Sequence, residues 1–133
     1  MEKVEAPICL DTDLLADFLR NKAYALEWFK KNEEKKLSTT IISVFELFYG
    51  AYKSSHPEQS ITSLNKLLDR LVILNLSKES VVEAGKQLSR LEQEGMSIDF
   101  RDALIATIAL TNDISLKTNN RKHFERISGL KLV

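Results

Sequence analysis

Short apolar runs alternate with longer amphipathic stretches along the whole chain. The apolar runs are rich in β-branched side chains, which is typical of buried strands. We expect strands at residues 8–10, 36–43, 72–76, 114–118 and 130–133. Between them, apolar positions recur three and four residues apart, which indicates helices. We expect helices at residues 14–20, 23–31, 44–53, 57–71, 78–95 and 99–111, with a helical turn at 121–127.

This alternation predicts the fold class. Strands that alternate with helices form a parallel sheet with helices packed on its faces. We therefore expect an α/β fold with a parallel central sheet of about five strands flanked by helices. The length of 133 residues suits one domain, so we expect a single domain over residues 1–133.

The composition is that of an ordinary soluble protein, with 44% hydrophobic and 29% charged residues. The formal net charge is zero, so there is no overall attraction to nucleic acid. No apolar run approaches the roughly 18 residues of a membrane helix, and Glu2 and Glu5 argue against a signal peptide. Cys9 is the only cysteine, which excludes an internal disulfide and a cysteine zinc site. We expect a cytoplasmic protein with no membrane contact.

Three acidic residues are expected where strands lead into helices. Asp11 follows the first strand, Glu46 lies one turn into the helix after the second, and Asp102 lies one turn into the helix at 99–111. In a parallel sheet these strand ends share one edge, and ligands bind there. The three carboxylates are therefore expected to meet in space although they are far apart in the sequence.

The surroundings of these acids favour a metal ion. No Lys or Arg shares the predicted helical face of Glu46. Buried carboxylates without basic partners are costly, and a bound cation keeps them ionised. Oxygen ligands suit Mg²⁺ or Mn²⁺. His56 and His123 lie outside any ligand spacing, so we expect both on the surface.

Helix capping is an alternative explanation for the same acids. Ser43 and Glu46 have the spacing of a capping box, and Asp99 can cap the helix that contains Asp102. Asp11 can likewise cap the first helix. A non-catalytic binding domain, whose acids only cap helices, stays open on these residues.

A haloacid-dehalogenase-like phosphatase is a second alternative. Asp11 and Asp13 form an Asp-x-Asp pair after a strand, as in that family. However, Leu15 replaces the usual Thr or Val, and the segment around Lys117 lacks that family's late acid pair. These departures make the phosphatase the weaker alternative.

Four sequence blocks follow one another along nearly the whole chain. They are LDTDLL with Asp11, SVFELFYG with Glu46, DFRDALIATIAL with Asp102, and LKTNNRKHFERISGL. In this order they resemble the blocks of PIN-domain ribonucleases, and most closely the VapC-like toxins of type II toxin–antitoxin pairs.

The resemblance implies a PIN-like nuclease domain that works as a Mg²⁺- or Mn²⁺-dependent endoribonuclease. Such an enzyme hydrolyses RNA phosphodiester bonds with a metal-activated water. The implied catalytic residues are Asp11, Glu46, Asp102 and Asn120, of which the first three are the metal ligands. The implied supporting residues are Thr118, Asp99 and Ser43. The resemblance also implies a homodimer that is held inactive by a small cognate antitoxin protein.

Overall fold

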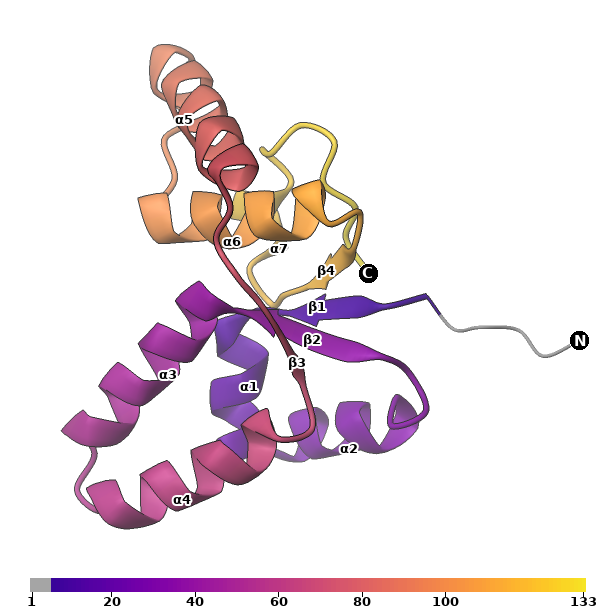
Figure 1. The fold of residues 1–133 in the computed structure, drawn as a ribbon, viewed down its shortest axis with the longest axis vertical. Coiled ribbons are helices and arrows are strands. Elements are labelled where there is room, and N and C mark those ends of the chain that lie inside the picture. The colour runs from indigo at the N-terminus through magenta and orange to yellow at the C-terminus, as the bar shows by residue number, and fades with distance from the viewer. Residues whose placement is uncertain (1–5) are drawn as a thin grey trace, which may run out of the picture.

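The computed structural model describes residues 6–133 (Figure 1). Within these residues, a parallel four-stranded sheet with the order β3-β2-β1-β4 forms the centre. The strands are β1 (Ile8–Leu10), β2 (Leu37–Thr40), β3 (Val72–Leu74) and β4 (Ser115–Lys117). The predicted α/β fold is confirmed. The described sheet has one strand fewer than expected, because the segment at 130–133 contributes only a bridge between Leu116 and Leu132.

Helices cover both faces of this sheet. They are α1 (Thr12–Leu19), α2 (Ala23–Lys31), α3 (Ile41–Lys53), α4 (Pro57–Leu68), α5 (Lys78–Gln93), α6 (Phe100–Thr111) and α7 (Arg121–Phe124). Helices α1 to α4 lie on one side, and α5 to α7 lie on the other (Figure 1). Alternate residues of β1 serve the two sides, since Ile8 and Leu10 belong to one core cluster and Cys9 to the other.

Helix α6 is the most deeply buried helix of the second layer. Its residues Ala103 and Ile105–Ala109 are all buried, and it packs on α5 while also contacting α3 and β4. This burial fixes the N-terminal turn of α6, which carries Asp102, next to α3. No helix within residues 6–133 combines the length and apolar character that a bilayer span requires.

Helix α3 begins at Ile41, three residues before the predicted start at 44. Its N-cap is Thr40, whose hydroxyl accepts a hydrogen bond from the Ser43 backbone N–H at 3.1 Å. Ser43 is therefore the third residue of the helix, and Glu46 lies in its second turn. The capping-box explanation of Ser43 and Glu46 is wrong, because the helix has already started at a threonine.

Candidate active site

Asp11 is the most buried acidic residue of the site, with 5% of its surface exposed. It follows β1 and caps α1, and its Oδ1 accepts the Thr12 backbone N–H at 2.7 Å. Burial raises the pKa of Asp11 from 3.8 to about 7, and the neighbouring charge of Asp13 adds to the shift. Asp11 is therefore an N-cap, as one explanation expected. A cap does not, however, require a carboxylate where burial disfavours its charged form.

The segment after β4 supports Asp11 from the other side. The Thr118 hydroxyl donates to Oδ2 of Asp11 at 2.7 Å and accepts the Asn120 backbone N–H at 2.9 Å. Thr118 is buried, and both Thr118 and Asn120 are distant from Asp11 in the sequence. The carboxylate is thus held by hydroxyl and amide donors that leave its charge in place.

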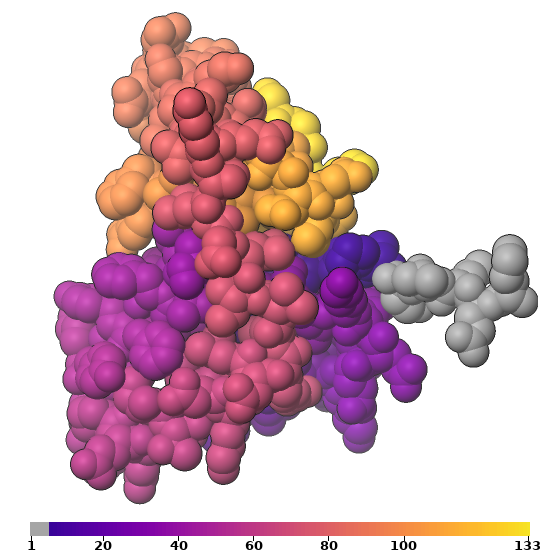
Figure 2. All heavy atoms as spheres, viewed as in Figure 1, coloured from indigo at the N-terminus to yellow at the C-terminus, as the bar shows by residue number. Residues whose placement is uncertain are grey.

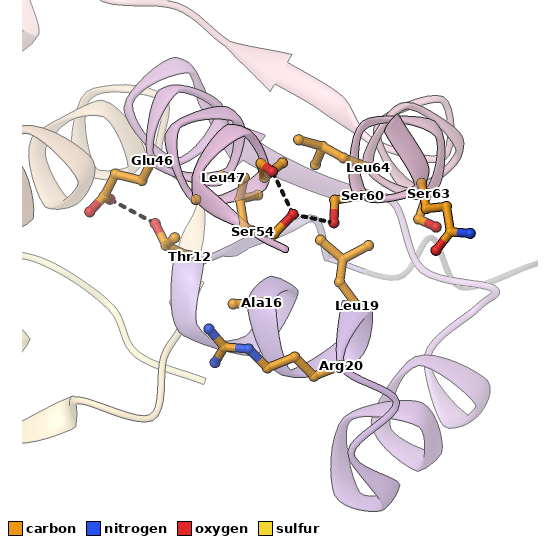
Figure 3. A pocket seen from close by; sticks show the side chains of 13 residues that line it. Thr12, Ala16, Leu19, Arg20, Glu46, Leu47, Ser54, Ser60, Ser63 and Leu64 are labelled. Atoms are coloured by element: carbon orange, nitrogen blue, oxygen red, sulfur yellow. Dashed lines mark hydrogen bonds between the residues drawn. The ribbon is translucent and has the colours of Figure 1, made fainter. Parts of the chain in front are cut away.

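Glu46 is held by a similar hydroxyl. The Thr12 hydroxyl lies 2.8 Å from Oε1 of Glu46 (Figure 3). It also lies 2.9 Å from the Ser43 hydroxyl. Since a carboxylate only accepts, the single Thr12 proton is directed at Glu46, and Ser43 supplies the proton of the other contact. This places Glu46 of α3 beside the first turn of α1, which begins immediately after Asp11.

Asp102 completes the group from α6. Its pKa is raised, first by partial burial and then by the nearby charges of Asp99 and Glu46. The charge of Asp102 in turn contributes to the raised pKa of Asp11. The three acids, which are far apart in the sequence, are therefore close enough for the charge of Asp102 to act on Asp11 and for the charge of Glu46 to act on Asp102.

One expectation about these acids is wrong. Glu46 was expected to lack a basic partner, but Nη1 of Arg101 lies 3.9 Å from its Oε2. Arg101 is held mainly by Asp99, with Nε to Oδ1 at 3.0 Å and Nη2 to Oδ2 at 3.1 Å. This pairing lowers the pKa of Asp99, which also caps α6 through the Arg101 backbone N–H. Asp99 is thus already paired with a cation, unlike Asp11.

Asn120 and His123 are in contact with each other. The Asn120 side-chain amide is 2.9 Å from Nδ1 of His123 and is engaged there rather than with the backbone of α7. The charge of His123 counteracts the raised pKa of Asp102, so this histidine is close to the acids. His56 is exposed as expected, and His123 is half-buried.

The donor set fits a hard divalent cation. Asp11, Glu46 and Asp102 offer carboxylate oxygens, and the pKa values of Asp11 and Asp102 are raised mainly by burial, with the charges of neighbouring acids adding to the shift. Across residues 6–133, no three His, Cys, Asp or Glu side chains form a ready-made metal-binding group. One oxygen of Glu46 instead accepts from Thr12, and the other faces Arg101.

Comparisons with known proteins show the family to which the chain belongs. A model of the PIN domain family matches residues 8–130. The chain belongs to the PIN domain family. Within it, the chain is 37% identical over 107 residues to ribonuclease VapC2 of Rickettsia felis, covering 80% of this chain and 78% of the relative. The family that the sequence blocks resemble is confirmed.

Two further relatives of this PIN domain cover nearly its full length. The tRNA(fMet)-specific endonuclease VapC of Shigella flexneri is 29% identical over 123 residues, which is 92% of both chains. The solved structure of VapBC2 from Rickettsia felis, bound to a DNA fragment from its promoter, has a TM-score of 0.87. It is 29% identical and covers 96% of this chain and 97% of that one.

Sequence reasoning missed three polar residues of this site: Thr12, Arg101 and His123. Thr12 stands next to Asp11, and Arg101 lies two residues after Asp99, so proximity to predicted site residues was the available signal. The partners of Thr12 and Arg101 come from contacts between α1, α3 and α6. The residue pattern along a single helix cannot predict such contacts.

The raised pKa of Asp11 predicts that the metal-free PIN domain is destabilised by its own carboxylate. The folded state holds the Asp11 proton more tightly than the unfolded chain, so this destabilisation is complete above a pH of about 7 and absent below about 4. Asp11→Asn should therefore raise the free energy of unfolding by ~2 kcal/mol at about pH 8. The gain should shrink as the pH falls toward 4.

Urea unfolding in the presence of a chelator, at a series of pH values, measures this difference. Asp113→Asn is the matched control, because Asp113 is exposed and its positive φ of 54° suits asparagine. Equal unfolding free energies for wild type and Asp11→Asn at about pH 8 would contradict the prediction.

Proposed function

We propose that this protein is a Mg²⁺- or Mn²⁺-dependent endoribonuclease and the toxin of a type II toxin–antitoxin pair. The observation that carries the proposal is the group of Asp11, Glu46 and Asp102, whose charges act on one another at one edge of the sheet. Support also comes from the relatives named ribonuclease VapC. Carboxylates that only capped helices would not need to be gathered in this way.

The roles of the site residues follow from their chemistry. Asp11, Glu46 and Asp102 would hold the ion, and Asn120 would add a neutral amide oxygen at the fourth position. When bound, such an ion supplies an activated water and neutralises charge on the phosphoryl oxygens. Reaction then requires no side-chain nucleophile. The hydroxyls of Thr12 and Thr118 orient the carboxylates of Glu46 and Asp11 without neutralising them, and the Ser43 hydroxyl contacts that of Thr12.

RNA is the proposed substrate. Relatives that cover most of the chain are named ribonuclease VapC, and one is named a tRNA(fMet)-specific endonuclease. Initiator tRNA is therefore the first RNA to test. Arg101 lies at the rim of the acids with its side chain half exposed, where it can contact an RNA phosphate.

Loss of one metal-binding carboxylate should abolish RNA cleavage. Asp11→Asn and Asp102→Asn should each reduce Mg²⁺-dependent cleavage of tRNA by more than about 100-fold, because each removes a charge that holds the ion. Gel analysis of the cleaved RNA measures this, with circular dichroism to show that each variant is folded.

Asp113→Asn is the control for these two variants, since Asp113 is exposed and its ion pair within residues 6–133 is with Lys131, at 3.6 Å. It should cleave RNA as wild type does, and a chelator should stop both. Full activity of Asp11→Asn or Asp102→Asn in Mg²⁺ would refute the assignment of the site.

An aromatic stripe on α3 supports the proposed homodimer. Phe45, Tyr49 and Tyr52 are spaced along one helical face and are 62%, 58% and 67% exposed. Phe45 stacks on Tyr49 at a ring-centroid distance of 6.2 Å. Helices α3 and α4 form one end of the molecule, opposite α5 (Figure 2). Large exposed aromatic side chains that share one face are typical of protein interfaces.

The solved structures of relatives support an antitoxin as the partner of this protein. The chain shares 29% and 28% identity with solved structures of VapBC2 from Rickettsia felis and VapBC-1 from Haemophilus influenzae, both named as VapBC assemblies. We propose a VapB-like antitoxin as the cognate partner of this protein.

Light scattering coupled to gel filtration should give about twice the chain mass of 15.2 kDa. Phe45→Glu should shift the protein toward the monomer without lowering its melting temperature, because the ring is exposed within one chain. Leu26→Glu, on an exposed position of α2, should leave the dimer intact. A wild-type monomer across the micromolar range would refute the homodimer.

A further inference from the structure

A pocket opens directly beside the acidic group, between α1, α3 and α4 (Figure 3). Its volume is about 560 Å³, within the roughly 300–1,000 Å³ of small-molecule sites. Thr12 and Glu46, which belong to the acidic site, also line this pocket. One ligand molecule could therefore place a group in the pocket and a phosphate at the carboxylates.

The walls of the pocket combine apolar surface with hydrogen-bonding groups. Leu19, Leu47 and Leu64 supply the apolar surface, while Gln59 and Ser63 supply polar groups from α4. Ser54 and Ser60 face each other at 2.8 Å across the α3–α4 corner (Figure 3). A nucleobase has an apolar face and polar edges, so it matches these walls.

Gly50 keeps one wall of the pocket open. It lies in the interior of α3, one turn after Glu46 and one turn before Ser54, where glycine destabilises a helix relative to alanine. A Cβ built on Gly50 would have no neighbouring heavy atom within 4 Å among residues 6–133. Packing of the described chain therefore does not require glycine at this position.

Positive charge continues away from the acids along the same path. Arg20 borders the pocket and extends along α1 toward Ala16 (Figure 3). A smaller hollow of about 240 Å³ shares Leu19 and Ser63 with the pocket and adds Lys66 and Arg70. A strand of phosphates that leaves the acidic site along this path would meet cations, which favours a nucleic acid over an apolar peptide.

We propose that this pocket binds one unstacked nucleotide of the RNA, next to the phosphate that is cleaved at the acidic group. The inference rests on the proposed ribonuclease function and adds to it a base-binding subsite.

Filling the pocket tests the proposal. Gly50→Leu places a side chain in the open wall, and Gly85→Leu is its matched control, because Gly85 lies in the interior of α5 with equally open space around it. Both changes should keep or raise the melting temperature, since leucine favours a helix over glycine. Gly50→Leu should lower kcat/KM for tRNA cleavage by about 10-fold or more, while Gly85→Leu should match wild type. Gly50→Ala should fold and show a smaller loss.

An RNA that lacks a single base provides the second arm. Removing the base beside the cleavage site should slow wild type as much as Gly50→Leu does, and the two changes together should cost little more than either alone. Additive losses would refute the subsite, and so would a Gly50→Leu variant that cleaves RNA as wild type does. Loss of protein-partner binding alone would assign the pocket to a protein segment and refute the proposal. Failure of wild type to cleave any RNA would instead refute the proposed function itself.

Discussion

Negative charge gathered at the carboxyl edge of a parallel sheet is the interaction on which the rest of this structure depends. The fold brings Asp11 from the end of β1, Glu46 from α3 and Asp102 from α6 to one place. Burial and mutual repulsion raise the pKa of Asp11 and Asp102, so the metal-free fold is destabilised by its own site. The proposed divalent cation would relieve this destabilisation.

Hydroxyl groups support these carboxylates where most buried acids would have a basic partner. Thr118 donates to Asp11, and Thr12 donates to Glu46 with Ser43 behind it. A hydroxyl fixes the direction of a carboxylate and leaves its charge available for a cation. Arg101 is the nearby exception, and its guanidinium is largely occupied by Asp99.

The sequence was sufficient for the fold class, and it led to the hypothesis that the three acids share one edge of the sheet. Strands alternate with helices, and this pattern alone predicts that the residues that follow the strands share the carboxyl edge of the sheet. Helix α2 has the predicted bounds, because its apolar spacing is clear between polar flanks. The start of α3 was misjudged, because Ile41 and Ile42 continue the β-branched pattern of β2 and conceal the cap at Thr40.

The contacts between helices and strands could not be predicted from the sequence. Arg101 reaches Glu46 from another helix, so the helical face of Glu46 could not reveal it. The pairing of His123 with Asn120 depends on where the segment after β4 lies. The pocket beside the acids is formed where α1, α3 and α4 come together. The interior glycine of α3 is its one local sign in the sequence.

The effect of Mn²⁺ on melting temperature tests the central claim most directly, because it reports binding without requiring cleavage. A cation that binds only the folded state stabilises it in proportion to the logarithm of its concentration. The account predicts that Mn²⁺ raises the melting temperature of wild type, whereas Asp11→Asn melts higher than wild type in chelator and does not respond to Mn²⁺. A wild-type melting temperature that is unchanged by Mn²⁺, or an equal rise in both proteins, would contradict it.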